Sequence, residues 1–245
     1  MPPRPRKKPY AFLPPLPRQA RGGTVPRIQD LVRDAIVRLA LPPGTFIDKA
    51  ALCRRLGVSR FPVSEALGRL AAEGLVEVLP QRGTRVTRID IVDCRQAMFI
   101  RRALEVEAVR ALASQADAAL LAELDRVLAG QRSAMESRDR GRFHDLDLAL
   151  HELLLDALGF ERVRSAVEAA RASLDRMRLL LCTPERQTAT FAEHQAIVAA
   201  LRRHAPEAAA AAMAAHLDAV MAELEAVAAA QPDAFTGPAE GTVAA

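Results

Sequence analysis

One stretch of the sequence decides the fold of the first third of the chain: Leu56-Gly57-Val58-Ser59-Arg60-Phe61-Pro62-Val63-Ser64-Glu65-Ala66-Leu67-Gly68-Arg69-Leu70. Gly57 is typical of a helix end, and Ser59 is a residue that caps the start of the next helix. Pro62 falls in the first turn of that helix, where its missing N–H does no harm. The apolar residues that follow recur every three or four positions, which predicts an amphipathic helix. Two helices joined by so tight a turn predict a helix-turn-helix.

The flanking segments complete a winged form of this motif. The spacing of apolar residues predicts further helices from Val25 to about Leu39 and from Lys49 to Leu56. Two short runs of β-type composition follow the central stretch, Leu75–Leu79 and Thr84–Thr87, with a turn that contains proline and glycine between them. This order of three helices and a β-hairpin predicts a winged helix-turn-helix domain over residues 25–89.

After Ile89 the sequence becomes rich in Ala, Leu, Arg and Glu and loses its β-type runs. Breaks at Gly, Pro and Asp residues predict six helices, at about 90–115, 117–137, 141–157, 160–182, 186–204 and 206–229. Short connections favour antiparallel neighbours, so the expected fold is mostly α, a winged domain followed by an antiparallel all-α bundle. The expected division is a disordered basic, proline-rich arm at 1–24, the winged domain at 25–89, the helical domain at 90–230 and a flexible tail at 231–245.

Charge is sorted by position along the chain. Residues 1–89 hold 17 Lys and Arg against 6 Asp and Glu, whereas residues 90–245 hold 17 against 24. The resulting net charges are +11 and −7, within a chain of net charge +4. A strongly basic small domain is typical of proteins that bind a polyanion, so we expect the winged domain to bind double-stranded DNA.

Cysteine usage and hydropathy indicate a cytoplasmic protein. Cys53, Cys94 and Cys182 lie far apart and in no C-x-x-C spacing, which favours reduced thiols over a disulfide framework or a zinc knuckle. No run of about 18 apolar residues is present, so we expect no membrane-spanning segment and no membrane partner. The basic start lacks the apolar core of a secretory signal; we expect a disordered tail, with a DNA-contacting arm as the alternative.

The second helix of a helix-turn-helix enters the major groove with its N-terminal residues at the base edges. The residues in that position are Ser59, Arg60, Phe61 and Ser64. Arg60 is the main candidate for base recognition, because a guanidinium can form two hydrogen bonds to guanine O6 and N7. Arg54, Arg55 and Arg82 flank the motif and the hairpin, where they would bind phosphate and supply affinity without sequence choice. The alternative is a solvated basic face without a ligand.

Four residues of the helical domain suggest a metal site. Asp147 and His151 stand four residues apart in a predicted helix and therefore project from one face. His194 and His216 lie in the fifth and sixth predicted helices. One carboxylate and three imidazoles can meet at a divalent cation such as Zn²⁺, Mn²⁺ or Ni²⁺. Spacing alone leaves open the alternative that these histidines are ordinary core or surface residues.

Four segments of the winged domain form a recognisable pattern: Leu41–Gly44, Leu56–Leu70, Glu73–Val76 and Arg82-Gly83. They resemble the N-terminal domain of GntR-family regulators. Arg60 and the hairpin residue Gly83 match the family, and the resemblance implies that both belong to the DNA-contacting surface. Two positions depart from it, because the family usually has threonine at Phe61 and arginine at Ser64. Since that arginine normally contacts DNA, we expect an operator that differs from the family's common one.

Four further motifs lie in the helical domain: Arg101-Arg102-Ala103-Leu104-Glu105, Asp147-x-x-x-His151, Glu193-His194-x-x-Ile197 and His216-Leu217. Over residues 90–228 the chain resembles the FCD effector domain, in its shorter, VanR-like branch. The resemblance implies that the aspartate and the three histidines bind a divalent metal and that a small organic acid completes the coordination. It also implies Arg101, or its neighbour Arg102, as the partner of the acid's carboxylate, because a buried guanidinium binds a carboxylate through two hydrogen bonds. Spacing alone fits an Arg101–Glu105 pair on the helix surface equally well.

These features together predict a homodimeric transcription regulator. Two winged domains would bind a near-palindromic operator, and an organic acid at the metal site would change the affinity for DNA; repression relieved by the acid is the expected sign. One alternative is a constitutive DNA-binding dimer whose helical domain is purely structural. The other is a metal-dependent hydrolase, because a metal with an open position can activate water. Against a hydrolase, the sequence has no nucleophile elbow, no phosphate-binding glycine loop and no general base at a recognised spacing.

Overall fold

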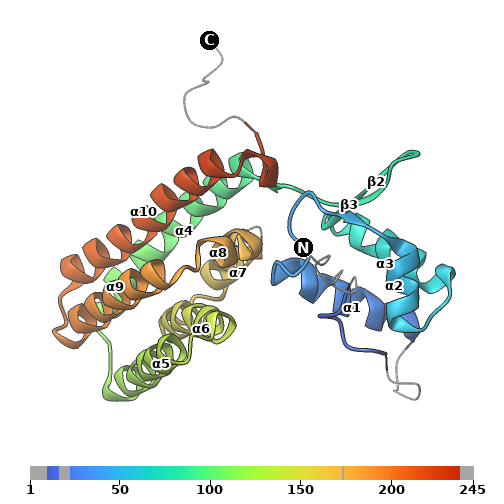
Figure 1. Cartoon of the computed structure of the whole chain (residues 1–245). Coiled ribbons are helices and arrows are strands. Elements are labelled where there is room, and N and C mark those ends of the chain that lie inside the picture. The colour runs from blue at the N-terminus through green and yellow to red at the C-terminus, as the bar shows by residue number, and fades with distance from the viewer. Residues whose placement is uncertain (1–9, 17–22, 173, 238–245) are drawn as a thin grey trace, which may run out of the picture. The chain divides into compact units, whose positions relative to one another are not determined.

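The chain folds into two compact units, residues 1–89 and 90–245. The computed structural model describes residues 10–16, 23–172 and 174–237, and Figure 1 shows their helices and strands along the chain. The prediction of a mostly helical chain, with a winged helix-turn-helix followed by a helical domain, is confirmed.

The first unit combines three helices with a small antiparallel sheet. Its elements are α1 (Thr24–Val37), β1 (Phe46–Ile47), α2 (Lys49–Leu56), α3 (Arg60–Ala72), β2 (Val76–Leu79) and β3 (Gly83–Val86). The strand order is β1-β3-β2, so the predicted hairpin forms and gains a third strand from the segment before α2. In this third strand, Phe46 lies opposite Arg85 and Ile47 lies opposite Thr84. Strand β1 was not predicted, because a run of two residues is too short to show the alternation of a strand.

The ends of α2 and α3 follow from local chemistry. Asp48 is the N-cap of α2, and its carboxylate accepts a hydrogen bond from the Ala51 N–H at 2.9 Å. Gly57 ends α2 at a φ of 70°, a conformation that other residues rarely adopt. Ser59 is the N-cap of α3 as expected, but its side chain accepts no capping hydrogen bond. The third residue of this helix is Pro62, which has no N–H to donate.

The core of the first unit is formed by one face of each helix. Its fully buried side chains, each exposed by 1 % or less, include Ile28, Val32, Ile36, Leu52, Val63, Leu67 and Leu70. The helical spacing of these residues leaves the opposite face of α3 in solvent, where Arg60, Phe61 and Ser64 lie. The core thereby fixes which side of α3 is available to a ligand.

The expectation of a disordered arm at residues 1–24 is wrong for residues 10–16. Tyr10 and Leu13 are 8 % and 3 % exposed and belong to the core of the first unit. The Tyr10 hydroxyl accepts a hydrogen bond from the Asp48 N–H at 2.7 Å, and the Arg55 guanidinium donates to the Leu13 carbonyl at 2.8 Å. Two apolar side chains and two hydrogen bonds thus offset the cost of ordering a proline-rich segment. Residues 1–9 and 17–22 lie outside the described residues.

The second unit is a bundle of helices. They are α4 (Ile91–Ala113), α5 (Ala118–Glu136), α6 (Arg140–Leu158), α7 (Glu161–Ala172), α8 (Asp175–Leu181), α9 (Pro184–Arg202) and α10 (Pro206–Ala230). The prediction of a single helix at 160–182 is therefore wrong within the described residues, since this segment contains α7 and α8. Both pieces contact α6, but α7 also packs on α4 whereas α8 packs on α10. No proline or glycine marks the break, so tertiary packing decides it.

Helix α10 runs beside α4 and α9, and α9 also contacts α5, which in turn packs on α6 (Figure 1). This arrangement brings the middle of α6, α9 and α10 toward one interior region of the bundle. The polar or charged side chains that are buried there or near it include Arg101, Glu105, Gln131, Asp147, His151, His194 and His216. Buried polar groups require partners, so the bundle interior is the place to search for a site.

The expectation of a flexible tail from residue 231 is wrong for its first part. A short 3₁₀ helix at Pro232–Ala234 leads into β5 (Phe235–Thr236), and Phe235 is 6 % exposed. A second sheet consists of β5 and the two-residue strand β4 (Ile89–Asp90). The described helices include none that is long and apolar enough to cross a membrane.

Candidate functional site

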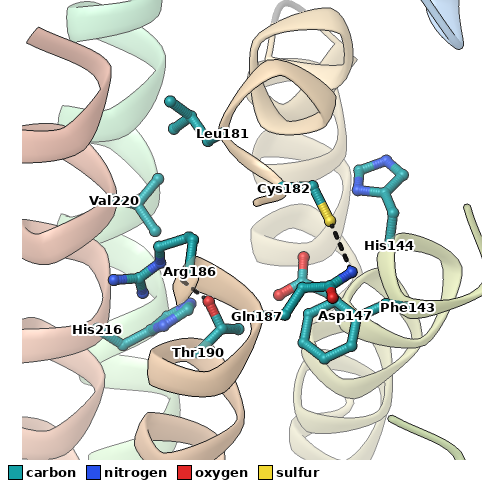
Figure 2. A pocket seen from close by; sticks show the side chains of 10 residues that line it. All are labelled: Phe143, His144, Asp147, Leu181, Cys182, Arg186, Gln187, Thr190, His216 and Val220. Atoms are coloured by element: carbon teal, nitrogen blue, oxygen red, sulfur yellow. Dashed lines mark hydrogen bonds between the residues drawn. The ribbon is translucent and has the colours of Figure 1, made fainter. Parts of the chain in front are cut away.

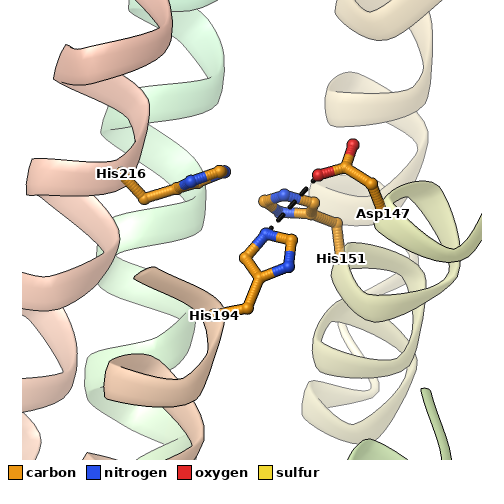
Figure 3. A group of neighbouring side chains, drawn as sticks. All are labelled: Asp147, His151, His194 and His216. Carbon is orange, nitrogen blue, oxygen red and sulfur yellow. Dashed lines mark ion pairs between the residues drawn. The ribbon is translucent and has the colours of Figure 1, made fainter. Parts of the chain in front are cut away.

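Four buried side chains meet in the interior of the second unit. Asp147 and His151 come from α6, His194 from α9 and His216 from α10 (Figure 3). Their nearest ligand atoms all lie within 4.8 Å of one another. Figure 3 shows the three rings and the carboxylate pointing toward a common centre. The structure therefore brings together all four residues that the sequence analysis selected as metal ligands; we call them the aspartate–histidine cluster.

The tautomer of His151 is set by a buried ion pair. Its Nδ1 lies 2.5 Å from Glu105 Oε2, and the Arg101 guanidinium donates to Glu105 Oε1 at 2.6 Å. Burial alone would raise the pKa of Glu105, but the charge of Arg101 and the hydrogen bond from His151 lower this pKa well below its ordinary value. An ionised carboxylate can only accept, so Nδ1 of His151 carries the proton and the lone pair lies on Nε2.

His216 has a matching arrangement on the other side of the cluster. Its Nδ1 lies 2.7 Å from Glu193 Oε2, and the Arg186 guanidinium donates to the same oxygen. Arg186 also lies 3.3 Å from Glu223 on α10. Burial would raise the pKa of Glu193, whereas the hydrogen bond from His216 and the charge of Arg186 lower it below its usual value. Glu193 is therefore ionised, and Nε2 of His216 is the free ligand atom.

His194 is oriented by a neutral partner. The Gln131 amide lies at hydrogen-bond distance from its Nδ1, with Nε2 of Gln131 at 3.0 Å and Oε1 at 3.2 Å. The other ring nitrogen of His194, Nε2, lies 3.4 Å from Asp147 Oδ1, the contact drawn in Figure 3. All three rings therefore turn Nδ1 outward to a partner and Nε2 toward the centre.

This donor set fits a divalent cation. The Nε2 atoms of His151 and His216 are buried and have no hydrogen-bond partner among the described residues, which is costly for polar atoms unless something else binds them. Burial lowers the pKa of His151 to about 4, although the Glu105 carboxylate opposes the shift, so the ring is neutral at neutral pH, as a metal ligand must be. Carboxylate and carboxamide partners on the outer nitrogens are the usual support of metal-binding histidines.

A pocket lies against the cluster (Figure 2). Asp147 and His216 belong to both, so a molecule in the pocket would touch two of the four cluster residues. Arg186, Gln187 and Thr190, all from α9, also line it. The Arg186 side chain is 11 % exposed and donates from Nε to the Thr190 hydroxyl at 3.0 Å. The pocket thus combines a cation and polar groups beside the cluster.

Arg101 and Arg102 occupy different surroundings from those that the sequence suggested. Arg101 is fully buried and forms the pair with Glu105, but inside the bundle rather than on its surface. Arg102 is half exposed and pairs with Asp218 on α10. Neither is among the residues that line the pocket at the cluster, whose arginine is Arg186.

Five residues of the site were not singled out from the sequence: Glu105, Gln131, Arg186, Glu193 and Glu223. Two of them, Glu105 and Glu193, stand within the quoted motifs, where Glu105 enters only as a surface partner of Arg101 and Glu193 only as the neighbour of His194. Gln131, Arg186 and Glu223 follow no spacing that relates them to a histidine, because their partners come from other helices or from two helical turns away. Only the packing of the bundle identifies them.

The candidate DNA-contacting residues lie on two exposed elements of the first unit. Arg60, Phe61 and Ser64 occupy the first two turns of α3, with Ser59 as its N-cap, and Arg82 and Gly83 lie at the β2–β3 turn. All six are exposed, as is Arg54 at the end of α2. Arg55 differs, because its guanidinium donates to the carbonyls of Ala11 and Leu13 and so fastens the N-terminal segment. Of the predicted phosphate contacts, Arg55 is thus already committed to a structural role.

Comparison with known proteins agrees with both halves of this description. The family model for bacterial regulatory proteins of the gntR family matches residues 24–86, and the model of the FCD domain matches residues 96–219. An uncharacterized HTH-type transcriptional regulator in unstable DNA locus of Streptomyces ambofaciens is 36 % identical over 205 residues, covering 83 % of this chain and 86 % of the relative. The HTH-type transcriptional repressor RspR of Escherichia coli is 32 % identical over 195 residues, covering 78 % of this chain and 84 % of the relative.

A solved structure shows the same fold. A putative GntR transcriptional regulator from Rhodococcus matches with a TM-score of 0.65 at 22 % identity, over 82 % of this chain and 96 % of that one.

Proposed function

Because the chain belongs to the GntR family of DNA-binding transcriptional regulators and carries an FCD domain, we propose that it is a repressor whose DNA affinity is controlled by a small carboxylic acid at the aspartate–histidine cluster. The observation that carries the proposal is the arrangement of His151 and His216, whose outer nitrogens bind carboxylates while their inner nitrogens are buried and meet no partner in the described part of the chain. Family membership also sets the hydrolase alternative aside, since these relatives are regulators and not enzymes.

The DNA-binding half of the proposal rests on α3 and the β-hairpin. Arg60 is exposed at the first position of α3 and, among the described side chains, pairs with no acid, so it is available to a guanine edge. Ser59 and Arg54 lie beside it, and Arg82 and Gly83 present the hairpin turn, where phosphate contacts would add affinity. Ser64 is too short to replace the long cation that the family usually has there, so base recognition falls on Arg60 and its neighbours.

Asp147, His151, His194 and His216 would hold the metal. When bound, a divalent ion such as Zn²⁺, Mn²⁺ or Ni²⁺ would supply positive charge and open coordination positions for a carboxylate. The chain itself supplies the fixed ring orientations, through Glu105, Gln131 and Glu193.

Arg186 is our candidate for the second contact to the acid. It is the arginine that lines the pocket, and its guanidinium already binds two carboxylates, those of Glu193 on its own helix and Glu223 on α10. An acid that binds Arg186 would compete with these glutamates and so change the contact between α9 and α10. Because the acid would then bind one arrangement of the bundle better than the other, it can shift the population between a DNA-binding and a released state.

A ligand titration of the full-length protein tests this proposal. We expect one of a panel of small acids (acetate, malonate, malate, citrate) to raise the melting temperature of the metal-loaded protein, since a ligand at 100 times its Kd stabilises by about 2.7 kcal/mol. The same acid should weaken binding to a DNA duplex selected by the protein from a random library, by about 5- to 150-fold. Removing the metal with a chelator should abolish both effects.

Arg186→Gln provides a sharper version of the test. It should retain DNA binding without acid and lose most of the response to acid, whereas Arg202→Gln, which removes an exposed arginine of the same helix, should behave like the unmodified protein. If metal-loaded protein binds DNA but no acid alters its melting or its affinity, the constitutive alternative is correct and the cluster is structural.

The homodimer that the proposal requires is supported by an exposed apolar surface on α4. Phe99 is 75 % exposed and Ile100 is 41 % exposed, beside a hollow lined in part by Met98 and Met221. Large exposed apolar patches commonly mark contacts between chains. We expect Phe99→Asp to shift the protein toward monomer in light scattering after gel filtration, whereas Phe160→Asp, at another exposed site in the same unit, should not. If Phe160→Asp yields a monomer and Phe99→Asp does not, the dimer interface lies at Phe160 and not on this surface of α4.

A further inference from the structure

The outward face of α3 is unusual in having one large apolar side chain among very small ones. Phe61, Ser64 and Gly68 are spaced three and four residues apart and are all exposed, so they form one ridge of the helix. Phe61 is 76 % exposed. The apolar residues that anchor α3 in the core, such as Val63 and Leu67, lie on the other side. Phe61 therefore contributes little to the folding of this unit.

Gly68 points independently to a partner on this face. It lies in the interior of α3, where glycine is less favourable than alanine. A Cβ at this position would meet no described atom within 4 Å, so packing within the described part of the chain does not require the glycine. An absent side chain on an exposed helix face allows the backbone to approach another molecule closely. With Gly68 and Ser64 so small, Phe61 is the side chain that projects furthest from this ridge.

We propose that Phe61 selects the operator by contacting the C5 methyl group of a thymine in the major groove. This inference goes beyond the DNA binding shown for the family, because it names a base and the group that reads it. The N-terminal residues of the second helix reach the base edges, and an apolar side chain can distinguish thymine from the other bases through its methyl group.

Charge favours DNA over a protein as the occupant of this face. Arg60, next to Phe61, is exposed and has no acidic partner among the described side chains, and residues 1–89 carry a net charge of +11. The acid nearest in sequence, Glu65, is paired with Arg69 at 2.7 Å. An apolar side chain beside an unpaired arginine suits a base edge that presents both a methyl group and, on the adjacent base pair, guanine acceptors.

Replacement of thymine by deoxyuridine tests the proposal, since deoxyuridine lacks only the C5 methyl group. A duplex would first be selected from a random library with the full-length protein, and each thymine would then be replaced in turn. We expect one position in each half-site at which the replacement weakens binding about fourfold, the value of one buried methyl group. With Phe61→Ala, the same replacement should have no effect.

Two controls keep the result specific. Phe46→Ala removes another exposed phenylalanine of the same unit and should leave the deoxyuridine effect intact. Phe61→Leu, which keeps an apolar side chain, should keep part of the deoxyuridine effect. Circular dichroism should show that both Phe61 variants are folded. If no thymine is sensitive to loss of its methyl group, or if the sensitivity is the same in Phe61→Ala, the proposal is wrong even though the protein binds DNA. If Phe61→Ala loses affinity equally for all duplexes, Phe61 contacts DNA without selecting a base, which also overturns it.

Discussion

Replacing Arg101 with alanine is expected to destabilise the second unit by about 3–5 kcal/mol, the typical cost of removing one partner of a buried ion pair. Arg101 is 0 % exposed and Glu105 is 2 % exposed, so no water is available to solvate the carboxylate that remains. Loss of the arginine also frees Glu105 from the geometry in which it binds His151. The measurement is urea unfolding followed by circular dichroism in the presence of a chelator, so that the stability change is not confused with loss of metal.

Arg102→Ala is the matched control for this prediction. It removes the neighbouring arginine, whose pair with Asp218 is half exposed, and exposed pairs contribute about 1 kcal/mol or less. A double variant, Arg101→Met with Glu105→Leu, should recover much of the loss, because removing both charges leaves no unpaired ion in the core. Equal effects of Arg101→Ala and Arg102→Ala would show that burial of the Arg101 pair does not matter to stability.

Replacing Asp147 with alanine is expected to lower metal affinity by at least about 100-fold, since even residues that only support a metal ligand contribute 10- to 100-fold. Asp147 supplies the one carboxylate among the four residues of the cluster. Glu105→Gln should lower the metal affinity by about 10- to 100-fold, because a carboxamide does not fix the tautomer of His151 as an ionised carboxylate does. Affinity would be measured by competition with a fluorescent chelator and metal content by mass spectrometry.

Asp145→Ala provides the comparison within the same helix. Asp145 lies two residues from Asp147 but is exposed, so its loss removes a carboxylate from α6 without touching the cluster. We expect its metal affinity to equal that of the unmodified protein. Tight, stoichiometric metal binding by Asp147→Ala would mean that the ion binds elsewhere and that the four residues only form a polar core.

Helix boundaries that depend on one or two residues could be predicted from the sequence. Gly57 and Gly159 end α2 and α6 at positive φ, and Pro184 and Pro206 begin α9 and α10, because glycine and proline impose their backbone preferences regardless of the rest of the chain. Asp147 and His151 stand four residues apart in one helix, so their position on one face also follows from the local sequence. Where no such residue marks a break, as between α7 and α8, the sequence predicted one helix and the structure has two.

The residues of the site also fall into those that local sequence identifies and those that only tertiary packing identifies. Short motifs identify the four cluster residues, but the arginine that lines the pocket is Arg186, whereas Arg101 binds Glu105 inside the bundle. The spacing of Arg101 and Glu105 does not show whether their ion pair is exposed or buried. Breaking an exposed pair changes the free energy of unfolding by about 1 kcal/mol or less, whereas breaking a buried pair costs several kcal/mol. The partners of the outer histidine nitrogens, such as Gln131, come from helices whose order in space the sequence does not reveal.

The sequence by itself determined the helix-turn-helix and the basic character of the first unit, because these depend on spacings within a helical turn and on composition. The four cluster residues follow from short motifs that resemble the FCD domain, since spacing alone left their role open. The tertiary structure alone decided the packing of Tyr10 and Leu13 on the first unit, the strand β1, the division of α7 from α8 and the pairing of each histidine with its orienting partner. These features depend on contacts between residues far apart in the chain. Their free energy comes from burial and from hydrogen bonds across elements, and neither is visible in local spacing.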